Sequence, residues 1–126
     1  MSKIKPKSNY DFPIKIISNL SEITYTTEEK THYHYMKDAK TQLHFDFLYK
    51  RNNNPKKKKT LTVLFHGRAP KNSYPVFRGY DYELENSDLL SLSDRLQKET
   101  NLELCFFLNY IEDYIEIINS IMSDGE

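Results

Sequence analysis

LTVLFHGRAP, at residues 61–70, joins a continuous apolar run to an abrupt polar break. Residues 60–65 lack the polar alternate positions of a half-exposed strand, which is typical of a strand covered on both faces. His66 and Gly67 end the run. A glycine at this point allows backbone N–H groups to turn toward a ligand, and it equally suits a tight strand exit. The residues alone leave both interpretations open.

The second half of the chain predicts further buried elements. LELCFFL, at residues 102–108, is another continuous apolar run and indicates a second buried strand. Between the two runs we expect a short strand at residues 89–93 and a helix from Asp94. The final segment, residues 110–126, has helical periodicity with Gly125 as a stop signal. Its apolar stripe comprises Ile111, Tyr114 or Ile115, Ile118, and Ile121 or Met122, and its polar side comprises Glu112, Asp113, Glu116 and Asn119.

The first half of the chain is rich in Ile, Thr, Tyr and Phe and predicts strands. The candidates are ITYTT (23–27), THYHYM (31–36) and QLHFDFLY (42–49). In the last, alternation directs Leu43, Phe45 and Phe47 to one face and His44, Asp46 and Leu48 to the other. We interpret these strands as an antiparallel meander with one solvent-exposed face. The fold class predicted for the whole chain is α/β, with antiparallel leading strands followed by part of a parallel sheet.

Length and composition place limits on the class of protein. The 126 residues suffice for one domain, and we expect a mobile basic arm at residues 1–10 and a single domain at 11–126. One cysteine, Cys105, rules out an internal disulfide framework, and its apolar neighbours favour a buried small side chain. No apolar run approaches the roughly 20 residues of a membrane span, and the N-terminus lacks a signal-peptide pattern. The expected location is therefore the cytoplasm.

Charge is distributed unevenly along the chain. Residues 1–60 carry 13 Lys/Arg against 6 Asp/Glu, and residues 61–126 carry 5 against 12. Such asymmetry indicates either an anionic partner for the basic half or attraction between the halves. The lysine run in RNNNPKKKK (51–59) has no interleaved aromatics or basic helix face, so we expect a solvated loop and no nucleic-acid partner.

Taken together, VLFHGRAPKNSYPVFRGY, LLSLSDRL and LELCFFLNY resemble the first half of the α/β-hydrolase fold. More narrowly, they are similar to bacterial hydrolase-like proteins linked to surface polysaccharide, including capsule O-acetyltransferases and the acetyltransferase-like component of accessory secretion systems. The resemblance covers residues 40–126. It implies a serine nucleophile acting on acyl esters of a surface glycan, with no cofactor.

The resemblance also implies roles for the residues that follow the strand at 60–65. The loop in this position donates an oxyanion N–H in the hydrolase fold, so the backbone N–H of Arg68, or that of Gly67, is assigned to the oxyanion hole. His66 would shape the loop. The chain departs from the family pattern because no Gly-x-Ser-x-Gly motif occurs in it. No serine of the chain has that setting, including Ser73, Ser91, Ser93, Ser120 and Ser123.

Other groups of side chains were weighed against plain structural roles. His32 and His34 lie on one face of a predicted strand about 7 Å apart, and with His44 they could hold zinc, although no carboxylate is spaced to complete a recognised site. Ordinary cross-strand packing is the favoured interpretation, so we expect no metal site. The alternating carboxylates Asp81, Glu83 and Glu85 could bind a cation or could simply be solvated. The tyrosines could stack on a sugar or could cover strand surfaces; they are Tyr33, Tyr35, Tyr80 and Tyr82.

Two functions from different classes remain on sequence grounds. The first is the N-terminal part of a serine-dependent acyltransferase or esterase, which carries the oxyanion loop and needs a C-terminal half for its nucleophile. The second is a small non-catalytic binding or assembly protein that pairs with another chain through a sheet edge. On the first hypothesis this chain alone is inactive.

Overall fold

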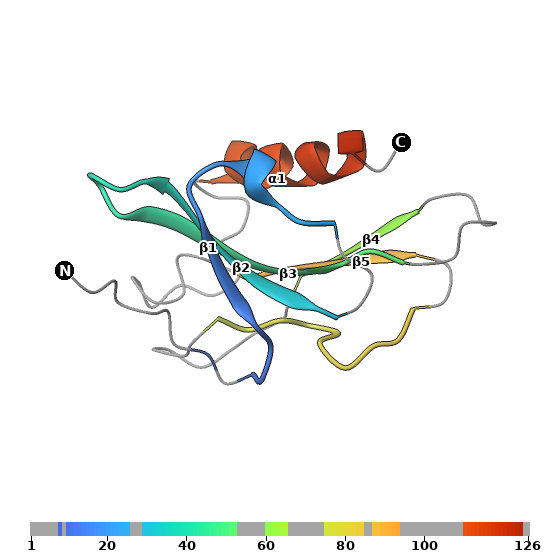
Figure 1. The fold of residues 1–126 in the computed structure, drawn as a ribbon. Coiled ribbons are helices and arrows are strands. Elements are labelled where there is room, and N and C mark those ends of the chain that lie inside the picture. The colour runs from blue at the N-terminus through green and yellow to red at the C-terminus, as the bar shows by residue number, and fades with distance from the viewer. Residues whose placement is uncertain are drawn as a thin grey trace.

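The computed structural model describes residues 8, 10–25, 29–52, 60–65, 75–84, 87–93 and 110–124. Within these ranges one α-helix lies against one face of a five-stranded sheet (Figure 1). The elements in chain order are β1 (Ile14–Ile17), the 3-10 helix η1 (Leu20–Glu22), β2 (Thr31–Asp38), β3 (Leu43–Lys50), β4 (Leu61–Phe65), β5 (Asp88–Leu92) and α1 (Ile111–Asp124).

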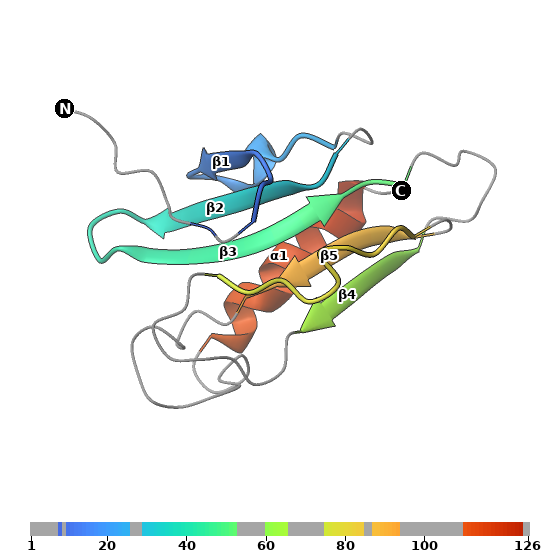
Figure 2. The ribbon, with the colours of Figure 1, turned by 90° about the horizontal axis from the view of Figure 1, so that it is seen from below.

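The sheet is mixed, with strand order β1-β2-β3-β5-β4 (Figure 2). The central pairs β2–β3 and β3–β5 are antiparallel, whereas the outer pairs β1–β2 and β4–β5 are parallel. An α/β-like architecture is therefore confirmed. The predicted leading meander is wrong in one respect, because the first strand of the sheet runs parallel to its neighbour.

The first strand was also misplaced by the sequence analysis. Strand β1 covers only IKII, too short for its alternation to stand out, whereas Ile23–Tyr25 of the predicted strand ITYTT form no strand. A capping box between Asn19 and Glu22 caps the start of η1, which ends immediately before them. The backbone then crosses the sheet face, where the Thr24 amide donates to the Tyr33 hydroxyl.

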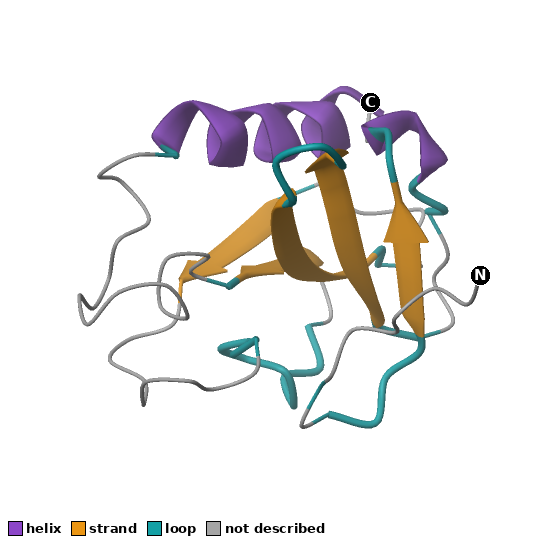
Figure 3. Cartoon of the chain, turned by 90° about the vertical axis from the view of Figure 1, so that its left-hand side faces the viewer, coloured by secondary structure: helices purple, strands orange, loops and turns teal. Residues whose placement is uncertain are grey.

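The main core lies between the sheet and α1, as the side view in Figure 3 shows. The helix begins at Ile111, within the predicted segment 110–126, and the residues it buries are Tyr114, Ile117 and Ile121. Of the predicted stripe, Ile111 and the alternatives Ile115 and Met122 are exposed. The buried line thus centres on Ile117, which the proposed stripe omitted. Aromatic side chains of β2 and β3 face this line: Tyr33, Tyr35, Phe45 and Phe47.

The opposite face of the sheet is covered as well, so the predicted solvent-exposed face is wrong. His32 and Leu48 are fully buried there. Residues 75–84 lie across this face (Figure 1) and place the Phe77 ring edge-on to His32, with ring centroids 5.0 Å apart. Gly79 has a φ of 75°, and a Cβ at this position would lie 2.4 Å from Cδ1 of Leu64. Glycine therefore permits both the turn and its close approach to β4.

The strands of the second half follow the predictions closely in position but not in burial. Strand β5 occupies Asp88–Leu92, within one residue of the predicted range, and all five of its residues are buried. Strand β4 occupies the predicted apolar run, yet each of its residues is only half-buried. Strand β4 is one of the two edge strands of the described sheet, which explains its partial exposure.

The two oppositely charged halves contact one another. Every described ion pair between a lysine and a carboxylate joins the basic half to the acidic half, namely Lys30–Glu83, Lys50–Glu83, Lys37–Asp113 and Lys37–Glu116. This supports attraction between the halves as the meaning of the charge asymmetry. Tyr10, at the end of the predicted N-terminal arm, packs its ring against Phe77.

Several predictions fall outside the described residues. They are the strand at 102–108, the helix from Asp94, the lysine run at 56–59, most of the N-terminal arm and the segment after β4. No helix within the described ranges is both long enough and apolar enough to cross a bilayer.

Candidate functional site

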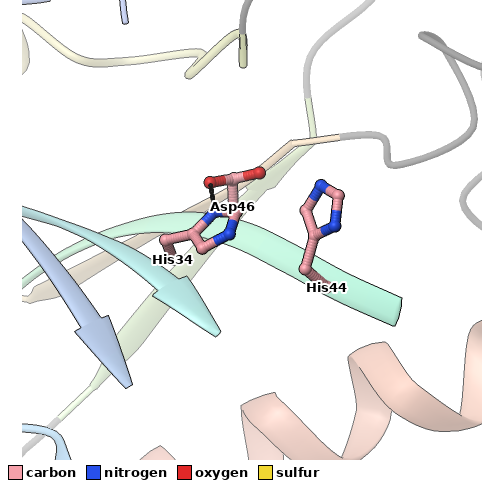
Figure 4. Close-up of side chains that lie close together, drawn as sticks. All are labelled: His34, His44 and Asp46. Atoms are coloured by element: carbon pink, nitrogen blue, oxygen red, sulfur yellow. Dashed lines mark hydrogen bonds and ion pairs between the residues drawn. The ribbon is translucent and has the colours of Figure 1, made fainter. Parts of the chain in front are cut away.

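A cluster of three histidines and one aspartate lies on the sheet face opposite α1. Alternation along β2 directs His32 and His34 to this face, and alternation along β3 directs His44 and Asp46 to it. The antiparallel register pairs His34 directly with Asp46. A His-x-His segment and a His-x-Asp segment on neighbouring strands thus bring the four side chains together, and Figure 4 shows His34, His44 and Asp46 of this cluster.

The carboxylate of Asp46 accepts two hydrogen bonds at the same oxygen. Nε2 of His32 lies 2.8 Å from Oδ1 of Asp46, and Nδ1 of His34 lies 2.9 Å from it. The rings of His34 and His44 are stacked at a tilt, with centroids 4.8 Å apart. One ligand atom from each of His34, His44 and Asp46 can be chosen so that all three lie within 4.8 Å of one another.

The interior side of this cluster is shielded from solvent. His32 is 0% exposed and Asp46 only 7% exposed, whereas His34 and His44 are half-buried. Burial on its own would raise the pKa of Asp46, but the hydrogen bonds and charges of His32 and His34 outweigh it and hold that pKa well below its ordinary value. The carboxylate is therefore ionised at neutral pH and is an acceptor for both rings.

His32 has an unusual environment for its second ring nitrogen. Its Nδ1 is buried and has no hydrogen-bond partner. A carboxylate only accepts, so Nε2 of His32 is the donor in its contact with Asp46. The sharing of Asp46 therefore favours the Nε2–H tautomer of His32.

His44 is oriented by the turn that joins β2 to β3. Its Nδ1 lies 2.8 Å from the carbonyl oxygen of Gln42, a residue with a φ of 63°. A carbonyl only accepts, so this contact places the proton of an uncharged His44 on Nδ1 and the lone pair on Nε2. The left-handed backbone at Gln42 thus sets the tautomer of a histidine two residues later.

Sequence patterns grouped the three histidines but did not relate the Asp46 carboxylate to them. It placed His44 and Asp46 on one face without relating that face to the His32–His34 face of the preceding strand. The usable signal was the pair of alternating motifs, His-x-His and His-x-Asp, on strands joined by a short polar turn. The structure places the Asp46 carboxylate within the group, which spacing along the chain did not indicate.

The predicted oxyanion loop follows β4. His66, Gly67 and Arg68 lie outside the described residues, whereas the strand that precedes them is described. Phe65, the last residue of β4, is paired with Leu92, the last residue of β5. Because the two strands are parallel, their carboxyl ends lie at the same end of the sheet.

The serines after and within β5 are engaged by the covering segment. Oγ of Ser91 donates to the carbonyl of Arg78 at 2.8 Å, and Oγ of Ser93 accepts from the amide of Val76 at 3.2 Å. Ser120 and Ser123 lie on α1, and Ser73 lies outside the described residues. None of the described serines contacts a histidine of the cluster through a described hydrogen bond.

The remaining candidate groups do not form sites among the described residues. Asp81 and Glu83 are exposed, Glu83 pairs with Lys30 and Lys50, and Glu85 lies outside the described ranges. The four tyrosines do not share a surface, because Tyr33 and Tyr35 are buried in the core whereas Tyr80 and Tyr82 are exposed.

Comparison with protein-family models, curated proteins and solved structures finds no match for this chain. The site must therefore be interpreted from its own geometry and chemistry.

Proposed function

We propose that this chain is the N-terminal part of a serine-dependent α/β-hydrolase-like acyltransferase or esterase that acts on a bacterial surface glycan. It would supply the oxyanion loop through the backbone N–H of Arg68 or Gly67, with His66 shaping the loop. The nucleophile would come from a C-terminal half. In this assignment the 126 residues alone do not catalyse acyl transfer.

The observation that carries the proposal is the parallel pairing of β4 and β5. In open α/β sheets, ligands bind beyond the carboxyl ends of parallel strands, where the loops that follow neighbouring strands converge. Phe65 and Leu92 end their strands side by side. The segment that begins at His66 therefore starts at the end of the sheet where a substrate site is expected.

The order of the strands also supports the proposal. From β2 onward the order is β2-β3-β5-β4. The pairs β2–β3 and β3–β5 are antiparallel, and β5–β4 is parallel, with β4 at the edge although it precedes β5 in the chain. The sequence resemblance implied antiparallel leading strands followed by part of a parallel sheet, and this arrangement agrees with that expectation. Strand β1, parallel to β2 at the far edge, is an addition to it.

Backbone donors at this position would have a defined chemical task. Acyl transfer from an ester passes through a tetrahedral intermediate whose oxygen carries negative charge. Two N–H groups aimed at that oxygen stabilise it, and the loss of one such donor typically reduces the rate by about 10²- to 10³-fold. The ester and glycan specificity of the proposal rests on the sequence resemblance alone.

A second candidate function is favoured by the position of β4. Its residues are half-buried and it is the outer strand of the described sheet, so it could pair with a strand of another chain. On this alternative the protein is a non-catalytic binding or assembly module. Thermal denaturation and dye binding of the isolated chain bear on both functions. A monomer that unfolds cooperatively and binds no hydrophobic dye would count against both an incomplete sheet and a docking edge.

The proposal is tested by the reading frame downstream of codon 126 in the source genome. A frame that continues into a strand followed by Gly-x-Ser-x-Gly, or an adjacent gene that encodes them, is the expected result. An unrelated gene, with no such motif in any chain that co-purifies with this one, would contradict the proposal and favour the assembly function.

A further inference from the structure

We propose that His34, His44 and Asp46 form a binding site for a divalent transition-metal ion of the zinc type. The site is separate from the proposed oxyanion loop and does not depend on it. It lies at the turn end of the β2–β3 hairpin, on the face opposite α1 (Figure 4).

The contact between His34 and Asp46 already has the spacing of two metal ligands. Ligand atoms bound to one zinc ion at about 2.1 Å lie about 3.0 to 3.5 Å apart. Nδ1 of His34 and Oδ1 of Asp46 are 2.9 Å apart. A metal ion would take the place of the proton that these atoms share, and both ligands would need little movement.

His44 supplies the third ligand after a modest movement. The three ligand atoms lie within 4.8 Å of one another, so the longest separation must shorten by about 1.5 Å to match a common zinc ion. His44 is half-buried at the turn, where its ring can rotate more readily than a core side chain. The contact between its Nδ1 and the Gln42 carbonyl resembles the outer-shell hydrogen bond that typically orients a metal-bound imidazole.

His32 completes the arrangement from the interior side. Its Nε2 lies 2.8 Å from Oδ1 of Asp46 and its ring is fully buried. It would act as a positioning residue that fixes the carboxylate, since ligating carboxylates are themselves hydrogen-bonded in metal sites. The buried side of the site is thereby fixed, while the half-buried His34 and His44 leave an approach for the ion.

The donor set determines which ions fit. Two imidazole nitrogens and one carboxylate oxygen suit zinc and the later first-row metals, whereas Mg²⁺ prefers oxygen ligands. Three protein ligands also leave a coordination position for water or a substrate atom. The chemistry therefore favours Zn²⁺ over Mg²⁺ and an open rather than a closed coordination shell.

Isothermal titration of the full chain with ZnCl₂ tests the proposal. The expected result is one equivalent of Zn²⁺ bound, no comparable heat with MgCl₂, and at least tenfold weaker binding in His34→Gln and in His44→Gln. Long-range ¹H–¹⁵N spectra should show the ring nitrogens of His34 and His44 shifting with Zn²⁺. Because His44 is half-buried, its variant is expected to fold, which circular dichroism checks.

Two matched controls distinguish this site from adventitious binding. His66→Ala removes the remaining histidine of the sequence, which the proposed site does not include, and Asp81→Asn neutralises an exposed carboxylate. Both should retain the wild-type zinc affinity. Absence of zinc binding in the folded wild-type chain, equal affinity in His44→Gln, or loss of binding only in His66→Ala would each overturn the proposal.

Discussion

His32 and Asp46 form a buried polar pair in which Nε2 of the ring lies 2.8 Å from Oδ1 of the carboxylate. The pair joins neighbouring strands diagonally across the register, because His32 is paired with Leu48 and Asp46 with His34. The same oxygen accepts from His34. One carboxylate thus satisfies two rings, and its removal leaves both without their partner.

Asp46→Ala is therefore expected to lower the free energy of unfolding by about 3 kcal/mol, since a buried donor without an acceptor is costly. Asp46→Asn retains an acceptor oxygen and should cost less, about 1 kcal/mol. Urea denaturation followed by circular dichroism measures both. Asp81→Ala, at an exposed position, should remain within about 0.5 kcal/mol of wild type. Equal losses for Asp46→Ala and Asp81→Ala would show that the pair is not buried as described.

The helix makes a sharper prediction about which of its isoleucines matter. Ile117 is 0% exposed, whereas Ile115 is 46% exposed. Ile117→Ala should lower the free energy of unfolding by about 2 to 4 kcal/mol, because it leaves a cavity between α1 and the sheet. Ile115→Ala makes the same chemical change and should cost well under about 1 kcal/mol. A reversed order of the two losses in urea would mean that α1 presents a different face to the sheet.

Gly79 tests the cover on the second face. An added Cβ meets Leu64 in β4, and the φ of 75° disfavours any L side chain. Gly79→Ala should therefore destabilise the protein by about 2 kcal/mol. Arg78→Ala, at the exposed neighbouring position, is the matched control and should be nearly neutral. If thermal denaturation finds the two variants alike, residues 75–84 do not pack on β4 in this way.

Tyr49 predicts a loss of stability at high pH. Burial, followed by the nearby Asp88 carboxylate, raises the pKa of the Tyr49 phenol above its ordinary value of about 10. Folding thus favours the protonated phenol, so the stabilisation is complete below about pH 10 and falls as the pH rises further, because the unfolded chain ionises first. Urea denaturation of Tyr49→Phe between about pH 9 and pH 11 should show a flatter decline than wild type. Tyr80→Phe, at an exposed ring, should retain the wild-type decline, and identical slopes for all three proteins would contradict the assignment.

Much of the fold was predictable because its local signals agreed with the tertiary structure. The apolar run at 61–65 and the helical periodicity at 111–124 each specify one element, and both elements form. The alternation in residues 43–49 assigned side chains to the correct faces of β3. It did not reveal that a covering segment buries the second face, because the contact between Phe77 and His32 joins residues far apart in the chain.

The candidate site was predicted only in part for a related reason. Alternation within one strand groups His32 with His34, but only the register between strands shows that Asp46 lies beside His34. The bulge between Met36 and Asp38 and the left-handed Gln42 set that register. Neither has a sequence signal as clear as Asn-Gly at a turn.

The central claim is that backbone amides after Phe65 stabilise an oxyanion for a serine supplied by the remainder of the enzyme. The direct measurement is the rate of fluorophosphonate labelling of the complete protein or complex purified from the source cell through a tag on this chain. We predict a labelled serine in a Gly-x-Ser-x-Gly peptide, labelling slowed about 10²-fold in Arg68→Pro, which lacks the N–H, and an unchanged rate in Arg68→Ala, which keeps it. Failure to label any serine in the purified material, or equal rates in the two Arg68 variants, would contradict the claim.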